Sequence, residues 1–160
     1  MRLLNAGKKF EQDFKASMPD DVLFIRLKDA GGWGREETKR FTIKNECDAI
    51  VFKMPKLFML ELKSYKGKSI SFDTCIRQYQ LDSLCKALPK KYVFAGYIFN
   101  FRDVEETYFV YADKVKEYVE NADRKSFPIQ WVRENGTIIE QTLKKTRYRY
   151  NIQKFIEDVI

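Results

Sequence analysis

Residues 47–63, C-D-A-I-V-F-K-M-P-K-L-F-M-L-E-L-K, give the strongest indication of the fold, because they contain two apolar runs joined at a proline. Residues 47–54 and 57–64 each have the length and composition of a β-strand. Pro55 and Lys56 between them predict a tight turn, and therefore an antiparallel hairpin. With the turn centred between these two residues, we expect Asp48 to face Lys63 and Ile50 to face Glu61.

This register places three charged side chains, Asp48, Glu61 and Lys63, on one face at the end of the hairpin. Opposed or diagonal side chains on one face lie roughly 5–8 Å apart, so two carboxylates can share a cation while an ammonium approaches its water. Phosphodiester hydrolysis needs such an activated water and neutralisation of charge on the phosphoryl oxygens. An ordinary exposed Glu-Lys pair is the alternative, but an unpaired glutamate inside the apolar run L-F-M-L-E-L would be costly to bury.

The amino-acid composition narrows the chemistry available to this site. The chain has 160 residues, no low-complexity tract and no histidine. Its length suits a single domain, residues 1–160. The absence of histidine excludes imidazole as base, nucleophile activator or metal ligand. Carboxylates, lysines and amides remain, and these groups bind hard cations such as Mg²⁺. The three cysteines lack metal-binding spacing and are expected to be reduced and mostly buried.

The charge balance indicates the class of partner. A net charge of +7 and a pI near 9.2 favour a polyanion such as nucleic acid. The sequence shows no apolar run long enough for a membrane span and no secretory pattern at its start. We therefore expect a cytoplasmic protein with no membrane partner and no organic cofactor.

Outward from the hairpin, periodicity and turn residues predict the remaining elements. Helices are expected at 5–17, 74–88, 113–121 and 151–160, and strands at 22–28, 69–72, 91–101 and 107–111. Asn135-Gly136 predicts a type I′ turn between strands at 129–133 and 137–141. This order indicates the α/β class, with a mixed sheet flanked by helices.

Several short motifs occur together in a definite order. They are G-K-K-F-E at 7–11, C-D-A-I at 47–50, L-E-L-K-S at 60–64, S-F at 71–72, Q-Y-Q-L-D-S-L at 78–84, and a terminal helix after Tyr150. Together they resemble the PD-(D/E)xK nucleases, and within them the RecU-type Holliday junction resolvases of Gram-positive bacteria and their phages. The resemblance implies a restriction-endonuclease-like fold and a homodimeric, Mg²⁺-dependent endonuclease that resolves branched double-stranded DNA, with Mn²⁺ able to substitute.

The resemblance also implies individual roles. Asp48 and Glu61 would bind the metal, Lys63 would assist the attacking water, Glu11 would add a carboxylate, and Gln80 would support the site from its helix. Glu11 is equally well explained as a helix-surface acid and Gln80 as a solvated residue, since both types are ordinary helix formers. Arg77, placed near the inward face of the same helix, would contact a phosphate or pair with an acid.

Two further segments are candidates for DNA binding. RecU-type enzymes carry a long stalk between the first strand and the hairpin, and the corresponding stretch here, about 28–46, is short. Trp33, Arg35, Lys39 and Arg40 would form a reduced stalk, with Trp33 stacking on a base or packed on the surface. Lys144, Lys145 and Arg147 would track a DNA backbone or form a solvated segment.

Two other functions remain open at this point. A restriction or repair nuclease on the same fold would share the charged triad but act on linear or damaged DNA. A recombination accessory protein would bind DNA through its charge and would not need the carboxylates.

Overall fold

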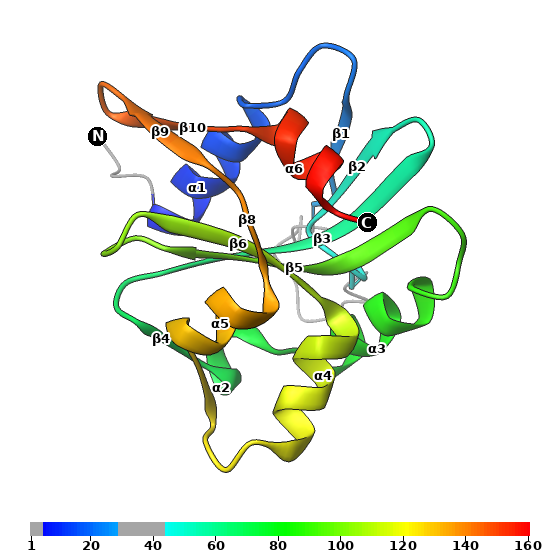
Figure 1. Ribbon diagram of the computed structural model, residues 1–160, viewed down its shortest axis with the longest axis vertical. Helices are drawn as coiled ribbons and strands as arrows, with labels where there is room; N and C mark the ends of the chain where they lie inside the picture. Colours follow the sequence, from blue (N-terminus) through cyan, green and yellow to red (C-terminus); the bar gives the residue numbers. More distant parts are fainter. Residues whose placement is uncertain (1–4, 29–43) are drawn as a thin grey trace, which may run out of the picture.

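A six-stranded sheet forms the centre of the protein in a computed structural model that describes residues 5–28 and 44–160 (Figure 1). Its strands follow the order β1-β2-β3-β5-β6-β8. Their bounds are β1 (Leu23–Arg26), β2 (Ala49–Lys53), β3 (Lys56–Tyr65), β5 (Val93–Phe101), β6 (Glu106–Tyr111) and β8 (Thr137–Ile138). β3 and β5 are parallel and the other neighbours antiparallel, so the sheet is mixed.

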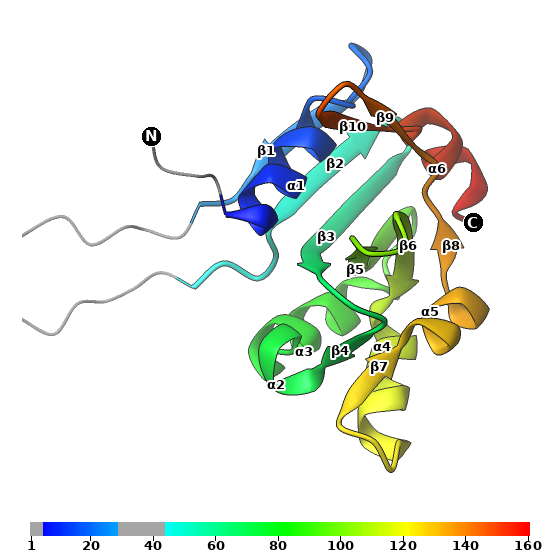
Figure 2. The same ribbon diagram turned by 90° about the vertical axis from the view of Figure 1, so that its left-hand side faces the viewer.

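Both faces of the sheet are covered (Figure 2). One face carries α1 (Ala6–Lys15), α6 (Ile152–Asp158) and the hairpin of β9 (Gln141–Lys144) and β10 (Arg147–Tyr150), while the other carries α3 (Gln78–Ala87), α4 (Ala112–Asn121) and α5 (Ile129–Asn135). Alternation along the strands fills both layers: Leu60 and Ile98 are buried under the first group, and Tyr97 and Phe99 under the second. The predicted α/β class, a mixed sheet flanked by helices, is confirmed.

The helix expected at 74–88 is two helices, α2 (Phe72–Cys75) and α3. Ile76 and Arg77 between them have extended backbone angles, which ends one helix and starts the next. The break lets Cys75 and Leu81 enter the same core. The short strand expected at 69–72 exists as β4 (Ser69–Ser71), paired with β7 (Ser126–Pro128), which the sequence did not indicate.

The hairpin expected around Asn135-Gly136 is wrong, because residues 129–135 form α5. Ile129 and Val132, three residues apart, are buried together on one side of this helix. Gly136 has a φ of −112°, whereas a type I′ turn needs positive φ at its central residues. An added Cβ at Gly136 would lie 2.7 Å from the carbonyl oxygen of Val132, so glycine serves a close approach here.

The predicted register of the β2–β3 hairpin is wrong by two residues. Lys53 pairs with Lys56 and Ile50 with Met59, so the turn consists of Met54 and Pro55. Proline has no N–H to donate to a ladder, which explains why Pro55 lies in the turn. A shift of two residues preserves the face on which every side chain lies.

The three cysteines form no disulfide bond. Cys47 and Cys75 are buried, Cys85 is partly buried, and all three thiols are free, as expected. Among residues 5–28 and 44–160, no helix is both long and apolar enough to cross a membrane.

Candidate active site

Glu61 and Lys63 lie on the same face of β3, toward α3, because they are two residues apart in a strand. Glu61 is only 1% exposed. The Lys63 Nζ lies 2.6 Å from Glu61 Oε1 and donates a hydrogen bond to it. A buried carboxylate is therefore held against an ammonium at the point where β3 approaches its end.

Asp48 joins this pair from the start of β2. It precedes Ala49, which pairs with Leu60, so Asp48 lies level with Glu61 rather than with Lys63 as the sequence predicted. The Asp48 Oδ2 accepts a hydrogen bond of 2.9 Å from the backbone N–H of Leu62. The structure thus brings the three predicted residues together despite the different register.

Burial and the neighbouring charges change the protonation of this cluster. Burial, followed by the charge of Asp48, raises the pKa of Glu61 from 4.5 to about 7, although Lys63 acts in the opposite direction. Burial alone would lower the pKa of Lys63, but Glu61 and Asp48 outweigh it and raise that pKa above its ordinary value. Two carboxylates so close together favour either a shared proton or a bound cation.

Gln80 approaches the same carboxylate from α3. Its Nε2 donates a hydrogen bond of 3.1 Å to Glu61 Oε2, and its side chain is buried. The Gln80 Oε1 is also buried and has no hydrogen-bond partner among the described residues, a costly state for a polar atom. Gln80 therefore contacts Glu61 from α3 and is buried rather than solvated.

These groups fit a hard divalent cation. In the described part of the chain, no three histidine, cysteine or acidic side chains gather as a metal site. The site instead offers two carboxylates, Asp48 and Glu61, beside the orphaned Gln80 oxygen. Such an all-oxygen donor set is the kind that Mg²⁺ and Mn²⁺ use, with water completing the coordination.

Arg26, at the end of β1, is a site residue that the sequence reasoning missed. Its guanidinium lies 3.0 Å from Glu11 Oε2 and 3.5 Å from Asp48 Oδ1. Its Nη1 also donates a hydrogen bond of 2.7 Å to the backbone oxygen of Asp48. Arg26 therefore links Glu11 on α1 to Asp48, and Glu11 is more than a solvated surface acid. The one available signal was an arginine at the end of the otherwise apolar run V-L-F-I-R.

The predicted DNA-binding residues are dispersed. Arg77 is exposed at the start of α3 and does not lie on its inward face, because the break before α3 changes the phase of the helix. Lys144 and Lys145 are exposed at the tip of the β9–β10 hairpin. Arg147 pairs with the buried Asp13. Trp33, Arg35, Lys39 and Arg40 lie outside the described residues.

Comparison with known proteins gives a family match, a sequence relative and a similar solved structure. The family described as RecU, Recombination protein U, matches residues 35–154. The SPbeta prophage-derived uncharacterized protein YotM of Bacillus subtilis (strain 168) is 32% identical over 171 residues, which cover 98% of this chain and 87% of the relative. Archaeoglobus fulgidus Hjc, a Holliday junction resolvase from an archaeal hyperthermophile, is similar in structure at 12% identity, with a TM-score of 0.47 over 74% of this chain and 83% of that protein.

The family match spans most of the chain and includes β2, β3 and α3, which carry Asp48, Glu61, Lys63 and Gln80. The mixed sheet flanked by helices is the architecture expected for the α/β class, and the family match confirms the resemblance to RecU-type proteins drawn from the sequence motifs. This protein belongs to the Recombination protein U family.

Proposed function

We propose that this protein is a Mg²⁺-dependent endonuclease that resolves four-way DNA junctions, with Mn²⁺ able to replace Mg²⁺. The observation that carries the proposal is the convergence of Asp48, Lys63 and Gln80 on the buried carboxylate of Glu61. The membership of a recombination protein family and the net charge of +7 support DNA as the substrate.

The chemistry is hydrolysis of a phosphodiester. A water loses a proton and its oxygen forms a bond to phosphorus, while the bond from phosphorus to the 3′ oxygen breaks. The 3′ oxygen takes up a proton, so a 5′ phosphate and a 3′ hydroxyl remain. A bound divalent cation supplies neutralisation of the phosphoryl charge and an acidified water. Asp48 and Glu61 would hold that cation.

Lys63, together with Gln80 and Arg26, would place the reactants. The Lys63 ammonium is fixed by its 2.6 Å contact with Glu61, so it is positioned to orient the attacking water or donate to a phosphoryl oxygen. Gln80 fixes Glu61, and Arg26 fixes Asp48. Binding geometry set in this way lowers the entropic cost of reaching the transition state.

Paired cuts on two strands imply two active sites, and a two-fold dimer supplies them by symmetry. We therefore include a homodimer in the proposal. Each partner would place one Asp48–Glu61–Lys63 cluster on one of the two strands that are cut.

Cleavage of three substrates in Mg²⁺ tests the proposal: a synthetic four-way junction, a linear duplex of the same sequence, and single-stranded DNA. We expect symmetric nicks in two opposing strands of the junction and little cleavage of the other two. Preferred cutting of linear duplex would instead indicate a restriction or repair nuclease on this fold.

Glu61→Gln separates a nuclease from a DNA-binding accessory protein. The variant should bind the junction as the wild type does and lose nicking, because the amide cannot replace the anionic metal ligand. Glu120→Gln on the exposed side of α4 is the matched control and should cut normally. Full nicking by Glu61→Gln would rule the proposed mechanism out.

A further inference from the structure

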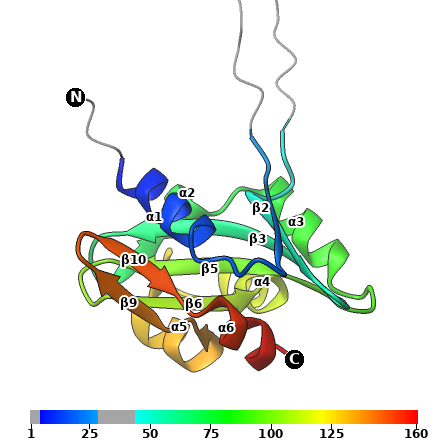
Figure 3. The same ribbon diagram turned by 90° about the horizontal axis from the view of Figure 1, so that it is seen from above.

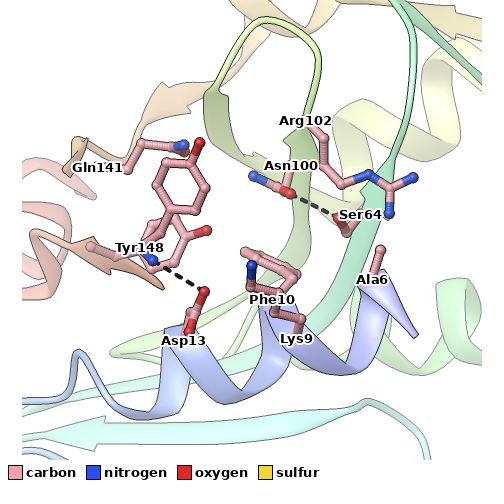
Figure 4. Close-up of a pocket in the computed structure, with 10 residues that line it drawn as sticks. Ala6, Lys9, Phe10, Asp13, Ser64, Asn100, Arg102, Gln141 and Tyr148 are labelled. Atoms are coloured by element: carbon pink, nitrogen blue, oxygen red, sulfur yellow. Dashed lines mark hydrogen bonds between the residues drawn. The ribbon is translucent and has the colours of Figure 1, made fainter. Parts of the chain in front are cut away.

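A cavity of about 240 Å³ lies between α1, the ends of β3 and β5, and the β9–β10 hairpin (Figure 4). Seen from above, α1 and β10 lie on the same side of the sheet (Figure 3). Ser64 lines the cavity and directly follows Lys63 in β3, so their side chains point to opposite faces of the sheet. The cavity is therefore separate from the Asp48–Glu61 cluster, yet it is only one residue away along the strand.

One wall of the cavity is a chain of hydrogen bonds between polar side chains. The Ser64 hydroxyl donates to Asn100 Oδ1 at 2.8 Å, and Asn100 Nδ2 donates to the Thr107 hydroxyl at 2.9 Å. Thr107 in turn donates to Gln141 Oε1 at 2.5 Å. This orientation leaves Gln141 Nε2 without an acceptor in the described part of the chain. An amide N–H facing a cavity is suited to an acceptor on the edge of a nucleobase.

Aromatic rings form other parts of the lining. Phe10, Tyr148 and Tyr150 all contribute, and the rings of Phe10 and Tyr150 meet edge to face with centroids 5.6 Å apart. Figure 4 shows Gln141 and Tyr148 to the left of the space, Lys9 below it on α1 and Arg102 at its upper right. Aromatic faces of this kind stack on bases of any sequence.

The charges at the cavity favour an anion. Lys9 and Arg102 line it, and neither makes a salt bridge with any described acidic residue. The acid in the lining, Asp13, is 2% exposed and is already neutralised by Arg147 and by a hydrogen bond from the Tyr148 backbone N–H. A phosphate at the rim would therefore meet two uncompensated cations and no free carboxylate.

We propose that this cavity binds a single unpaired nucleotide of the DNA, with its base among the aromatic rings and Gln141 and its phosphate between Lys9 and Arg102. The inference rests on the proposed function, since a branched DNA offers bases at its crossing point that are cheaper to unstack than those of a continuous duplex. One nucleotide held here would set which phosphate reaches the cluster on the other face of β3.

Two DNA probes test the base-binding part directly. One is a duplex with a single unpaired adenine, and the other is the same duplex with an abasic residue in its place, which keeps the phosphates and removes the base. Affinities are measured in EDTA, so cleavage plays no part. We expect the adenine probe to bind roughly 10-fold more tightly, within the range of stacking one base on an aromatic side chain.

Variants assign the preference to the cavity. Gln141→Ala and, independently, Tyr148→Leu should bring the two probes close to equal affinity, whereas Arg102→Ala should weaken both probes alike. Gln130→Ala and Arg124→Ala, both exposed and not among the residues that line the cavity, are the controls. Thermal melting shows whether each variant is folded. If either Gln141→Ala or Tyr148→Leu fails to fold, the other variant alone tests the site.

These binding measurements can fail or succeed independently of the nicking assay that tests the proposed function. Equal affinity of the wild type for the two probes, or a preference that survives both Gln141→Ala and Tyr148→Leu, overturns the nucleotide site even if junctions are still nicked. A base preference in a protein that fails to nick junctions would retain the site and overturn the nuclease.

Discussion

Glu61 has an environment unlike that of an ordinary carboxylate. It is buried, it lies beside a second carboxylate, and it is contacted by Lys63 and Gln80. Burial and Asp48 raise its pKa to about 7. A carboxylate in this state stabilises the folded protein when protonated and lowers its stability when ionised.

This pKa predicts a pH dependence for the metal-free protein. Below the ordinary value of 4.5, Glu61 is protonated in both the folded and the unfolded states. Between 4.5 and about 7 the folded state retains a proton that the unfolded state has released, so the free energy of unfolding falls as the pH rises. Above this range the Glu61 contribution should be constant.

Urea unfolding in EDTA from pH 4.5 to 8.5 measures this effect as the difference between wild type and Glu61→Gln. Taking the difference in the free energy of unfolding cancels the contributions of the titrating groups that the two proteins share. We expect the wild type to lose stability relative to the variant up to about pH 7. A difference that stays flat across the whole range would show that Glu61 titrates normally.

Arg26 illustrates what the sequence alone did not provide. Its partners Glu11 and Asp48 are 15 and 22 residues away in the chain, and the contact arises only because β1 pairs with β2 while α1 packs across the sheet. Asp48 and Glu61 were predictable because they share one local hairpin. A contact that joins three separate elements, as Arg26 joins α1, β1 and β2, leaves little trace in the local sequence.

Removing the Arg26 side chain should slow nicking roughly 10- to 100-fold, as loss of a residue that orients a metal ligand typically does. Arg26→Lys should recover part of the rate, since lysine keeps the charge but not the forked donors. Single-turnover nicking of a four-way junction gives the comparison, with Arg124→Ala as control. An unchanged rate for Arg26→Ala would exclude a role in orienting Asp48.

Among the elements, β5 supports the candidate site by pairing in parallel with β3 from Leu57 to Tyr65, the segment that carries Glu61 and Lys63. Gly96 in β5 lies so close to β6 that an added Cβ would be 2.2 Å from the Val110 carbonyl oxygen. The Val110 carbonyl is part of the backbone of β6, so it cannot move aside as the end of a flexible side chain can. The glycine is therefore required by packing between two strands.

Gly96→Ala should lower the free energy of unfolding by about 3 kcal/mol, the upper part of the range for overpacking a core. Gly7→Ala in the first turn of α1 is the matched control, because the nearest contact of its added Cβ is 3.6 Å away. We expect that change to be neutral or to stabilise by up to about 1 kcal/mol. Chemical denaturation measures both, and equal effects would contradict the packing argument.

The elements also show where sequence patterns succeed. The β2–β3 hairpin was predictable because two strongly apolar runs flank a proline, even though the register was two residues off. Residues 129–133 were misassigned because Asn135-Gly136 has the composition of a hairpin turn, whereas packing of Trp131 against Tyr118 and Phe127 favours a helix. Local turn propensity is weaker than burial in a shared core.

At the scale of the whole molecule, the proposed dimer predicts how mixed assemblies behave. Wild type and Glu61→Gln, refolded together, should form hybrids with one competent and one incompetent site. Such hybrids should nick one strand of the junction and leave the opposing strand intact. Denaturing gels of a junction labelled on both strands report this, and equal cutting of both strands by the isolated hybrid would contradict the pairing of sites.

The proposed chemistry requires that Asp48 and Glu61 together hold a divalent cation. Calorimetric titration of the protein with Mn²⁺ tests it most directly, in wild type, Asp48→Asn, Glu61→Gln and the exposed control Glu120→Gln. We predict binding by the wild type and the control, and loss of that binding in both Asp48→Asn and Glu61→Gln. Undiminished Mn²⁺ binding in these two variants would contradict the account.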